Sequence, residues 1–331
     1  MKRFFGVSLA LTLSCAGLCG CSGDAADGGP VRLKLGYVMA PQGAAHEAAE
    51  QFAALVAEKT AGAVEVEVKH SAQLGTDRQL TEGLLLGTVD LVLSGFASVS
   101  GFIPQYEPLE APFAFRDYGH MEKVLEGDIG QEAADALREQ NGIEILAWWP
   151  RGPRYLTANR PVRTPADLKG LKLRVPELPH YIAAWKILGA NTTPITYSEM
   201  FMALKQGVAE GQENPLEVIY TAGLYDVQDY VMETKHLIGS YLLMMGAPAV
   251  RKLDDAQRAA IREAAAEAGD FERRRMLELE AEYKARLREH GMEWVVPEDR
   301  AAFARPVVEN LPERFSDRWK DGLYARIRAI E

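Results

Sequence analysis

Segment 171–176 carries the cations whose spacing best fits binding chemistry. Apolar residues alternate with Lys172 and Arg174, so a half-buried strand here would place both cations on the face opposite the apolar one. Pro176 ends such a strand because it lacks a backbone donor. Arg174 would then lie at the carboxyl end of a strand, where open α/β sheets bind ligands. A guanidinium there can donate two hydrogen bonds to one carboxylate, each worth about 1.5 to 3 kcal/mol. The sequence therefore predicts an acid-binding protein, with a structural ion pair to Glu177 or another carboxylate as the alternative.

Asn214 is a second candidate for the same chemistry. It lies in the run Gly-Gln-Glu-Asn-Pro at 211–215. Its amide both donates and accepts hydrogen bonds, which suits a carboxylate oxygen or a hydroxyl. An asparagine before proline is also a common turn former, which is the alternative interpretation.

The composition argues against several other classes of protein. The sequence lacks Gly-x-Ser-x-Gly, His-Glu-x-x-His, a phosphate-binding Gly-Lys-Ser/Thr loop and Gly-x-Gly-x-x-Gly. The six histidines are scattered singly, so we predict no cofactor and no metal, with a site of dispersed carboxylates as the open alternative. A net charge of -10 argues against nucleic acid, whose phosphates need clustered Lys and Arg. It also disfavours long-range steering of an anion, so any acid-binding power must be local.

The first 30 residues predict export. Met1–Arg3 precede a mostly apolar run at 4–18, which is typical of a secretory signal and short for a membrane span. All three cysteines fall in residues 1–21, so we expect no disulfide in the mature domain. The run 18–21, Leu-Cys-Gly-Cys, resembles a lipoprotein processing box with Cys21 as the lipidated residue. A cleaved signal with incidental cysteines is the alternative. Residues 22–30 are small and polar, as in a flexible tether.

The remainder predicts an α/β protein with two lobes. Strand patterns alternate with helix patterns, which favours largely parallel sheets. The expected strands are 31–38, 64–68, 89–93 and 143–149, and the expected helices are 44–58, 77–86 and 121–140. A second lobe would begin near Gly152, where two prolines interrupt the pattern. A charged, alanine-rich stretch at 254–290 predicts a helix about 50 Å long if it is continuous, long enough to cross both lobes. A five-residue step from Phe271 to Met276 leaves a kink as the alternative.

Together these motifs resemble the extracytoplasmic solute-binding proteins of TRAP transporters, the DctP family. The resemblance runs from about Leu33 to about His236 and depends on the order and spacing of several short motifs. These motifs are His46, Glu58-Lys-Thr-Ala-Gly62, Gln73-Leu-Gly75, Ala111-Pro-Phe113, Pro165-Ala-Asp-Leu-Lys-Gly170, Leu171-Lys-Leu-Arg-Val-Pro176, Leu188-Gly-Ala-Asn191, Ser198-Glu199, Ala203-Leu204 and Gly211-Gln-Glu-Asn-Pro215.

The resemblance implies a two-lobed periplasmic-binding-protein fold, of the Venus flytrap kind, with a long helix spanning both lobes. Lobe I would comprise 31–151 plus about 240–279, and lobe II 152–239 plus about 280–331. The protein would work in the periplasm, held to a membrane only through a lipid anchor. It would capture a small organic acid for the small and large membrane subunits of a TRAP permease. A sugar acid such as a uronate or aldonate is favoured by segments 174–181 and 226–228, with a C4-dicarboxylate next.

The resemblance also implies roles for individual residues. Arg174 would pair with the substrate carboxylate, Arg154 would lie near the same acid group, and Asn214 would contact the ligand. Tyr197 would form an aromatic wall. Weaker assignments to the cleft are His46, Gln73, Ser94, Phe96 and Glu213. Two arginines facing one cleft would repel each other until an anion arrives, which would make closure depend on the ligand.

Each assignment has a structural alternative, and the chain as a whole has two functional ones. Arg154 could be a hinge arginine, and His46 or Ser94 a helix cap or core partner. One functional alternative is an exported enzyme that anchors a carboxylated substrate on Arg174 and uses Glu213 or His46 as proton carrier. The other is a sensor or adaptor that presents a bound acid to a partner protein.

Overall fold

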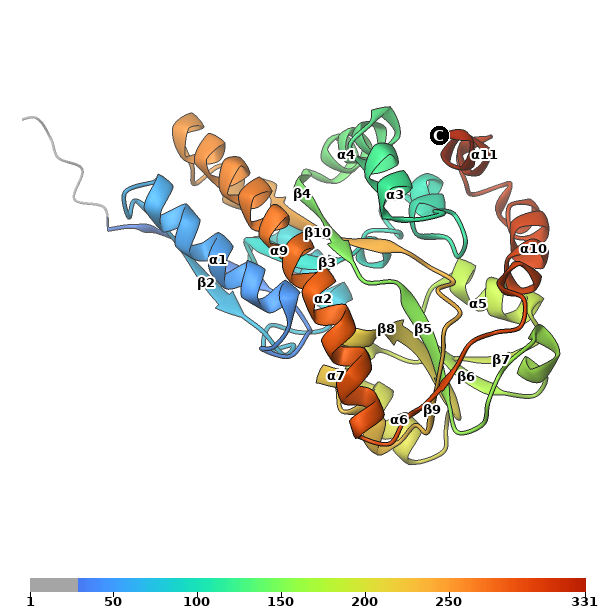
Figure 1. Ribbon diagram of the computed structural model, residues 1–331. Helices are drawn as coiled ribbons and strands as arrows, with labels where there is room; N and C mark the ends of the chain where they lie inside the picture. The colour runs from blue at the N-terminus through green and yellow to red at the C-terminus, as the bar shows by residue number, and fades with distance from the viewer. Residues whose placement is uncertain (1–28) are drawn as a thin grey trace, which may run out of the picture.

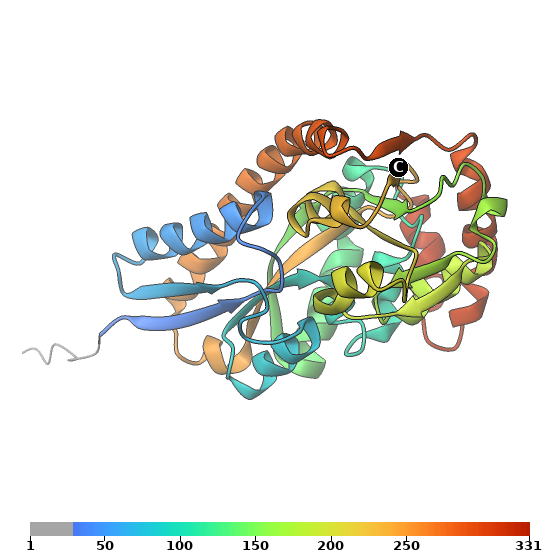
Figure 2. The same cartoon turned by 90° about the horizontal axis from the view of Figure 1, so that it is seen from below.

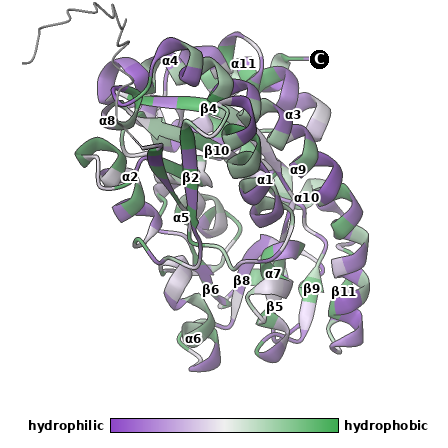
Figure 3. Ribbon diagram, turned by 90° about the vertical axis from the view of Figure 1, so that its left-hand side faces the viewer, coloured by the Kyte–Doolittle hydropathy of each residue, from purple (hydrophilic) through white to green (hydrophobic). Residues whose placement is uncertain are grey.

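The computed structural model describes residues 29–331, which form two lobes, each built on one β-sheet (Figure 1). The sheet of lobe I has the order β2-β1-β3-β10-β4, and the sheet of lobe II has the order β11-β9-β5-β8-β6-β7. Figure 3 shows the first sheet above the second. The strands are β1 (Val31–Gly36), β2 (Val64–Lys69), β3 (Leu91–Gly95), β4 (Ile143–Arg151), β5 (Arg154–Ala158), β6 (Lys172–Val175), β7 (Asn191–Pro194), β8 (Gly211–Pro215), β9 (Tyr230–Met232), β10 (Gly239–Gly246) and β11 (Glu293–Val295).

Helices cover both sheets. The α-helices are α1 (Ala44–Lys59), α2 (Asp77–Leu86), α3 (Tyr118–Leu125), α4 (Asp128–Asn141), α5 (Pro179–Ile187), α6 (Met200–Lys205), α7 (Leu216–Thr221), α8 (Ala247–Val250), α9 (Asp255–Glu289), α10 (Arg300–Asn310) and α11 (Leu323–Ala329). Short 3-10 helices include η1 (Phe96–Ser98), η2 (Pro104–Glu110) and η4 (Tyr197–Glu199). Across residues 29–331, no helix combines the length and the apolar composition that a membrane crossing requires.

The expectation of largely parallel sheets is wrong for the strands that connect the lobes. β1 pairs in parallel with β2 and β3, as a βαβ unit requires. β10, however, returns from lobe II and enters between β3 and β4, antiparallel to both. In lobe II, β5 is likewise antiparallel to β8 and β9, whereas β6 is parallel to β7 and β8. Both sheets are therefore mixed.

The helix expected at 121–140 is divided into two helices. α3 ends at Leu125 and α4 begins at Asp128, with Gly127 as the N-cap. A Cβ on Gly127 would lie 2.6 Å from the carbonyl oxygen of Lys123, so this turn requires a residue without a side chain. Two helices consequently cover the stretch where the periodicity suggested one.

α9 is one continuous helix of 35 residues. The Asp254 side chain caps its start by accepting a hydrogen bond from the Gln257 backbone N–H at 2.8 Å. The helix packs against α1 and β4 in lobe I and against α7 in lobe II, and Figures 1 and 2 show it beside α1. It therefore spans both lobes, and the kink considered between Phe271 and Met276 does not divide it.

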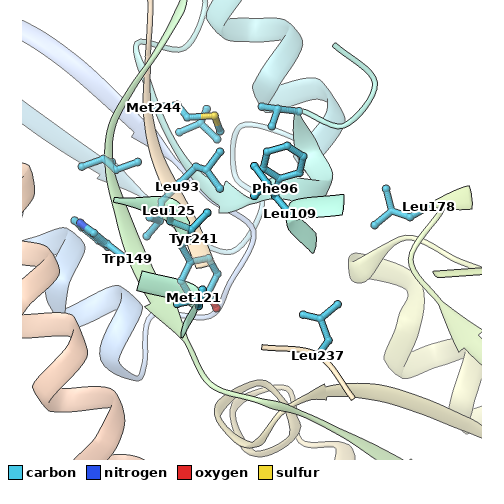
Figure 4. Packing of buried hydrophobic residues seen from close by; sticks show 14 of the residues in the cluster. Leu93, Phe96, Leu109, Met121, Leu125, Trp149, Leu178, Leu237, Tyr241 and Met244 are labelled. Atoms are coloured by element: carbon cyan, nitrogen blue, oxygen red, sulfur yellow. The ribbon is translucent and has the colours of Figure 1, made fainter. Parts of the chain in front are cut away.

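Buried aromatic and aliphatic side chains fix α9 to the sheet of lobe I. The indole of Trp149 donates to the carbonyl oxygen of Ala265 at 2.9 Å. Gly269 makes room for that ring, because a Cβ there would lie 2.7 Å from Trp149 Cδ1. Figure 4 shows Trp149 with Tyr241 and neighbouring apolar residues of this core.

Two chain segments cross between the lobes side by side. β4 continues into β5 through Gly152 and Pro153, while residues 233–238 lead from β9 back to β10. The Arg154 backbone N–H donates to the Leu237 carbonyl at 2.9 Å, which joins the two crossings.

The chain after α9 contacts both lobes. β11 joins the lobe II sheet and α10 packs on α5, but α11 packs on η2 of lobe I. In the same segment, the Trp319 indole donates a hydrogen bond to Glu107 of lobe I at 3.1 Å. The sequence-based boundary, which placed all of 280–331 with lobe II, does not describe this last segment. The predicted signal peptide and Cys21 lie outside the described residues.

Candidate functional site

A cavity of about 740 Å³ lies between the lobes. Lobe I contributes the start of α2, the end of β3 and the end of β4, and lobe II contributes β6, the segment 195–198 and the end of β8. Among its lining residues are Asp77, Ser94, Glu110, Arg151 and Tyr241 from the first lobe, and Arg154, Arg174, Tyr181, Tyr197 and Asn214 from the second. Carboxyl ends of β3, β4, β6 and β8 all meet here, where α/β sheets place ligands.

Arg174 is buried in the wall of this cavity, with 3% of its surface exposed. Its Nε and Nη2 donate to the Ile195 carbonyl at 2.9 and 2.6 Å, which fixes the guanidinium plane. Within residues 29–331, no carboxylate lies within 4.0 Å of it. Burial lowers the pKa of Arg174 to about 10, partly offset by Glu213, so the side chain remains charged at neutral pH. The structural alternative, an ion pair with Glu177 or another carboxylate, is not formed in the part of the chain that the structure describes.

The parallel pairing of β6 and β8 brings Asn214 to the same edge as Arg174. Asn214 is 2% exposed and its amide nitrogen donates to Gln212 Oε1 at 2.6 Å. Gln212 in turn donates to the Thr157 hydroxyl at 2.9 Å. This buried chain of hydrogen bonds holds the Asn214 side chain in one orientation at the cavity wall.

Arg154 lines the cavity too, but it has a partner in the protein. Its Nε lies 2.5 Å from Glu213 Oε2 and its Nη2 2.8 Å from Glu213 Oε1, a forked pair across β5 and β8. His236 Nε2 lies 2.9 Å from the same carboxylate. Burial would raise the pKa of Glu213, but Arg154 and His236 outweigh it and lower that pKa to about 2. Arg154 still lowers the pKa of Arg174, as the expected repulsion between the two requires, but Glu213 acts more strongly in the opposite direction. The repulsion is therefore offset within the protein.

Glu213 itself does not line the cavity and is fully buried. Its assignment to the cleft is corrected by this pairing. The low pKa also removes the basis for using Glu213 as a proton carrier, since a carboxyl that ionises near pH 2 is a weak base at neutral pH.

Tyr197 and Ser94 lie at the cavity, on opposite lobes. Burial raises the pKa of Tyr197 to about 12, so its hydroxyl stays protonated. The Ser94 hydroxyl donates to Asp77 Oδ1 at 2.6 Å. The structure thus places Arg174, Arg154, Asn214, Tyr197 and Ser94 around one cavity.

Three of the weaker candidates lie elsewhere. His46 does not line the cavity, and its Nδ1 lies 2.6 Å from the Tyr37 hydroxyl. Gln73 is exposed in the turn after β2. Phe96 is 2% exposed and stacks on Trp148 at 6.4 Å between ring centroids, as part of the lobe I core. The assignment of these three residues to the cleft wall is wrong, because each one packs in the protein or lies in a turn and does not line the cavity.

The sequence did not single out five charged residues that line the cavity. These residues are Asp77, Arg78, Glu82, Glu110 and Arg151. Burial raises the pKa of Asp77 and of Glu110. Glu110 accepts from the Ala97 backbone N–H at 2.5 Å, and the Tyr181 hydroxyl lies 3.2 Å from its other oxygen. Arg151 could have been found by the signal that revealed Arg174, a cation at the carboxyl end of a strand.

Within the described residues, no three His, Cys, Asp or Glu side chains are grouped to hold a metal ion.

Comparison with known proteins identifies the class to which this cleft belongs. The model of the family described as bacterial extracellular solute-binding protein, family 7 (DctP) matches residues 35–316. The chain belongs to this family and is a solute-binding protein of the TRAP type. Proteins of this type are periplasmic, bind small organic acids and work with TRAP membrane permeases.

Particular relatives support the same assignment. The chain is 32% identical to the 2,3-diketo-L-gulonate-binding periplasmic protein YiaO of Escherichia coli, with 86% of each protein covered. A TRAP solute-binding protein of Roseobacter denitrificans with bound L-galactonate has a TM-score of 0.85 and 34% identity, covering 91% of this chain and 99% of that one. A third, from a Polaromonas species and bound to D-erythronate, has a TM-score of 0.87 and 30% identity, with coverage of 91% and 99%. The predicted fold is confirmed.

Proposed function

We propose that this protein captures a sugar acid and holds it in the cavity between its lobes. The observation that supports this most is the Arg174 guanidinium, which is buried, charged and without a carboxylate partner in the described residues. Three of its five N–H donors remain after the two bonds to Ile195, enough for a forked contact with one carboxylate. L-galactonate and 2,3-diketo-L-gulonate, the cargoes named for two relatives, both carry such a carboxylate.

The other lining residues fit a hydroxylated cargo. We propose that Asn214 contacts the acid or a neighbouring hydroxyl, and that Tyr197 covers the carbon chain. Ser94 and the carboxyl groups of Asp77 and Glu110 supply hydrogen-bonding partners on the opposite wall. Arg154 adds positive potential to the cavity, but its Nε and Nη2 already donate hydrogen bonds to Glu213. We therefore propose that Arg174 makes the forked contact with the carboxylate of the cargo.

Closure of the lobes follows from where these groups lie. Arg174 and Asn214 belong to lobe II, whereas Asp77, Ser94 and Glu110 belong to lobe I. A cargo that contacts both walls stabilises the closed form, because only contacts that differ between the open and closed states shift their balance. We propose that the closed protein then delivers its cargo unchanged to a TRAP permease.

A thermal-shift screen against aldonates, uronates, aldarates and C4-dicarboxylates tests this function. A true cargo at about 100 times its Kd adds about 2.7 kcal/mol to stability, which raises Tm measurably. Neutral parent sugars at the same concentrations are the matched control. Stabilisation by neutral sugars alone would contradict the proposal.

We propose, from the sequence alone, that Cys21 is lipidated and anchors the protein to a membrane. The processing-box pattern at 18–21 supports this. The Cys21→Ser variant should move from the membrane fraction to the soluble periplasmic fraction. Identical fractionation of both forms would overturn the anchor and leave cargo binding untouched.

A further inference from the structure

Arg151 is a second cation at the cavity that lacks an ion-pair partner. It is the last residue of β4, it is partly buried, and it lines the cavity from lobe I. Within residues 29–331, no carboxylate lies within 4.0 Å of its guanidinium. Its Nε is buried and has no hydrogen-bond partner. Arg151 and Arg174 therefore carry unpaired charge into one cavity from opposite lobes.

The surroundings of Arg151 hold it toward the cavity. Its guanidinium carbon lies 4.9 Å from the ring centroid of Tyr241, which also lines the cavity on the neighbouring strand β10. On the other side of β10, a Cβ on Gly95 would lie only 3.2 Å from Arg151 Nη1. Gly95 has an ordinary φ of -67°, so its backbone does not require a glycine. The missing side chain instead leaves the space that the guanidinium enters.

Four arginines of the described residues line the cavity, and two of them, Arg151 and Arg174, have no ion-pair partner. Arg78 pairs with Glu82 at 2.9 Å. Arg154 is neutralised by Glu213. Asp77 and Glu110 also line the cavity, but in residues 29–331 neither carboxylate lies within 4.0 Å of Arg151 or Arg174. In the same cavity these two groups and Ser94 offer hydrogen-bonding partners suited to hydroxyls.

We propose that Arg151 binds a second anionic group of the cargo, so that the preferred cargo is a hydroxylated diacid of the aldarate class, gripped at one end by Arg174 and at the other by Arg151. This inference rests on the proposed function and deepens it. Each end of the cargo would be held by a different lobe, so a diacid would favour closure more than a monoacid of the same length.

Calorimetric titration with a matched pair of probes tests the proposal. Galactarate and galactonate share a carbon skeleton and differ only in a terminal carboxylate or CH2OH group. The native protein should bind galactarate at least about tenfold more tightly, as expected when a partly buried cation gains its partner. Arg151→Gln should abolish that preference, because it should lower the affinity for galactarate at least about tenfold more than the affinity for galactonate. Arg138→Gln, an exposed arginine on α4 paired with Asp135, is the control and should keep the preference.

A second variant tests the same contact if Arg151→Gln does not fold. Gly95→Ala places a methyl group against Arg151 Nη1 and should reduce the galactarate preference without removing the cation. Tighter or equal binding of galactonate by the native protein, or a preference that survives Arg151→Gln, would overturn the inference. That result would leave the proposed function standing. Failure of every acid in the panel to bind would instead contradict the proposed function itself.

Discussion

Replacing Arg174 by alanine should weaken cargo binding strongly, since this side chain is the proposed carboxylate anchor. The guanidinium is 3% exposed and is oriented by two hydrogen bonds to the Ile195 carbonyl. Truncating one partner of a buried charge pair costs about 2 to 5 kcal/mol. At about 1.4 kcal/mol per factor of ten, affinity should fall by about 30-fold to a few thousandfold.

Isothermal titration calorimetry with the acid found by screening measures this loss. Arg174→Lys keeps the charge but loses the fork, so its affinity should lie between those of the native and alanine proteins. Arg305→Ala is the control, because Arg305 is an exposed lobe II arginine paired with Asp299 and remote from the cavity lining. Affinity of Arg174→Ala within about twofold of native would refute the anchor, since such a change is far below the cost of unpairing a buried charge.

Other predictions concern the buried carboxyls. Glu213→Gln breaks the pair with Arg154 and should lower the free energy of unfolding by about 3 to 5 kcal/mol in urea denaturation. A loss below about 1 kcal/mol would show that the pair is dispensable. The pKa of Glu213 is lowered to about 2 in the fold from 4.5, so its stabilisation is present above pH 4.5 and lost as pH falls toward 2. The stability gap between native protein and Glu213→Gln should narrow over that range, and a constant gap would contradict the assignment. Burial raises the pKa of Glu217 from 4.5 to about 7, so the folded state retains a proton and stability should fall as pH rises across this interval. Glu217→Gln should flatten that dependence in pH-resolved melting curves, and an unchanged slope would assign it to other groups.

Much of the fold could be predicted because local patterns determine it. The capping and periodicity of α2 gave its bounds, and the alanine-rich pattern at 254–290 gave the long helix α9. The antiparallel entry of β10 between β3 and β4 could not be predicted, because it depends on pairing between strands far apart in the sequence. The break at Gly127 was missed because both helices keep the same apolar periodicity.

The candidate site could likewise be predicted only in part. Arg174 could be predicted because it lies at the end of a recognisable strand. The pairing of Arg154 with Glu213 could not, since the two residues lie on different strands and 59 positions apart in the sequence. His46 was misassigned because its partner is the Tyr37 hydroxyl, which only the packing of α1 on the sheet reveals. Arg151 ends a strand as Arg174 does, but the predicted strand 143–149 stopped two residues before it, whereas β4 runs to Arg151.

A crystal structure of the protein with its natural cargo tests the central claim most directly. We expect a cargo carboxylate to accept two hydrogen bonds from Arg174 at about 2.7 to 2.9 Å, with the lobes closed around it. Contacts from the cargo to both lobes should be visible in the same structure. A bound cargo without an acidic group, or an Arg174 side chain directed away from the cargo, would contradict the account.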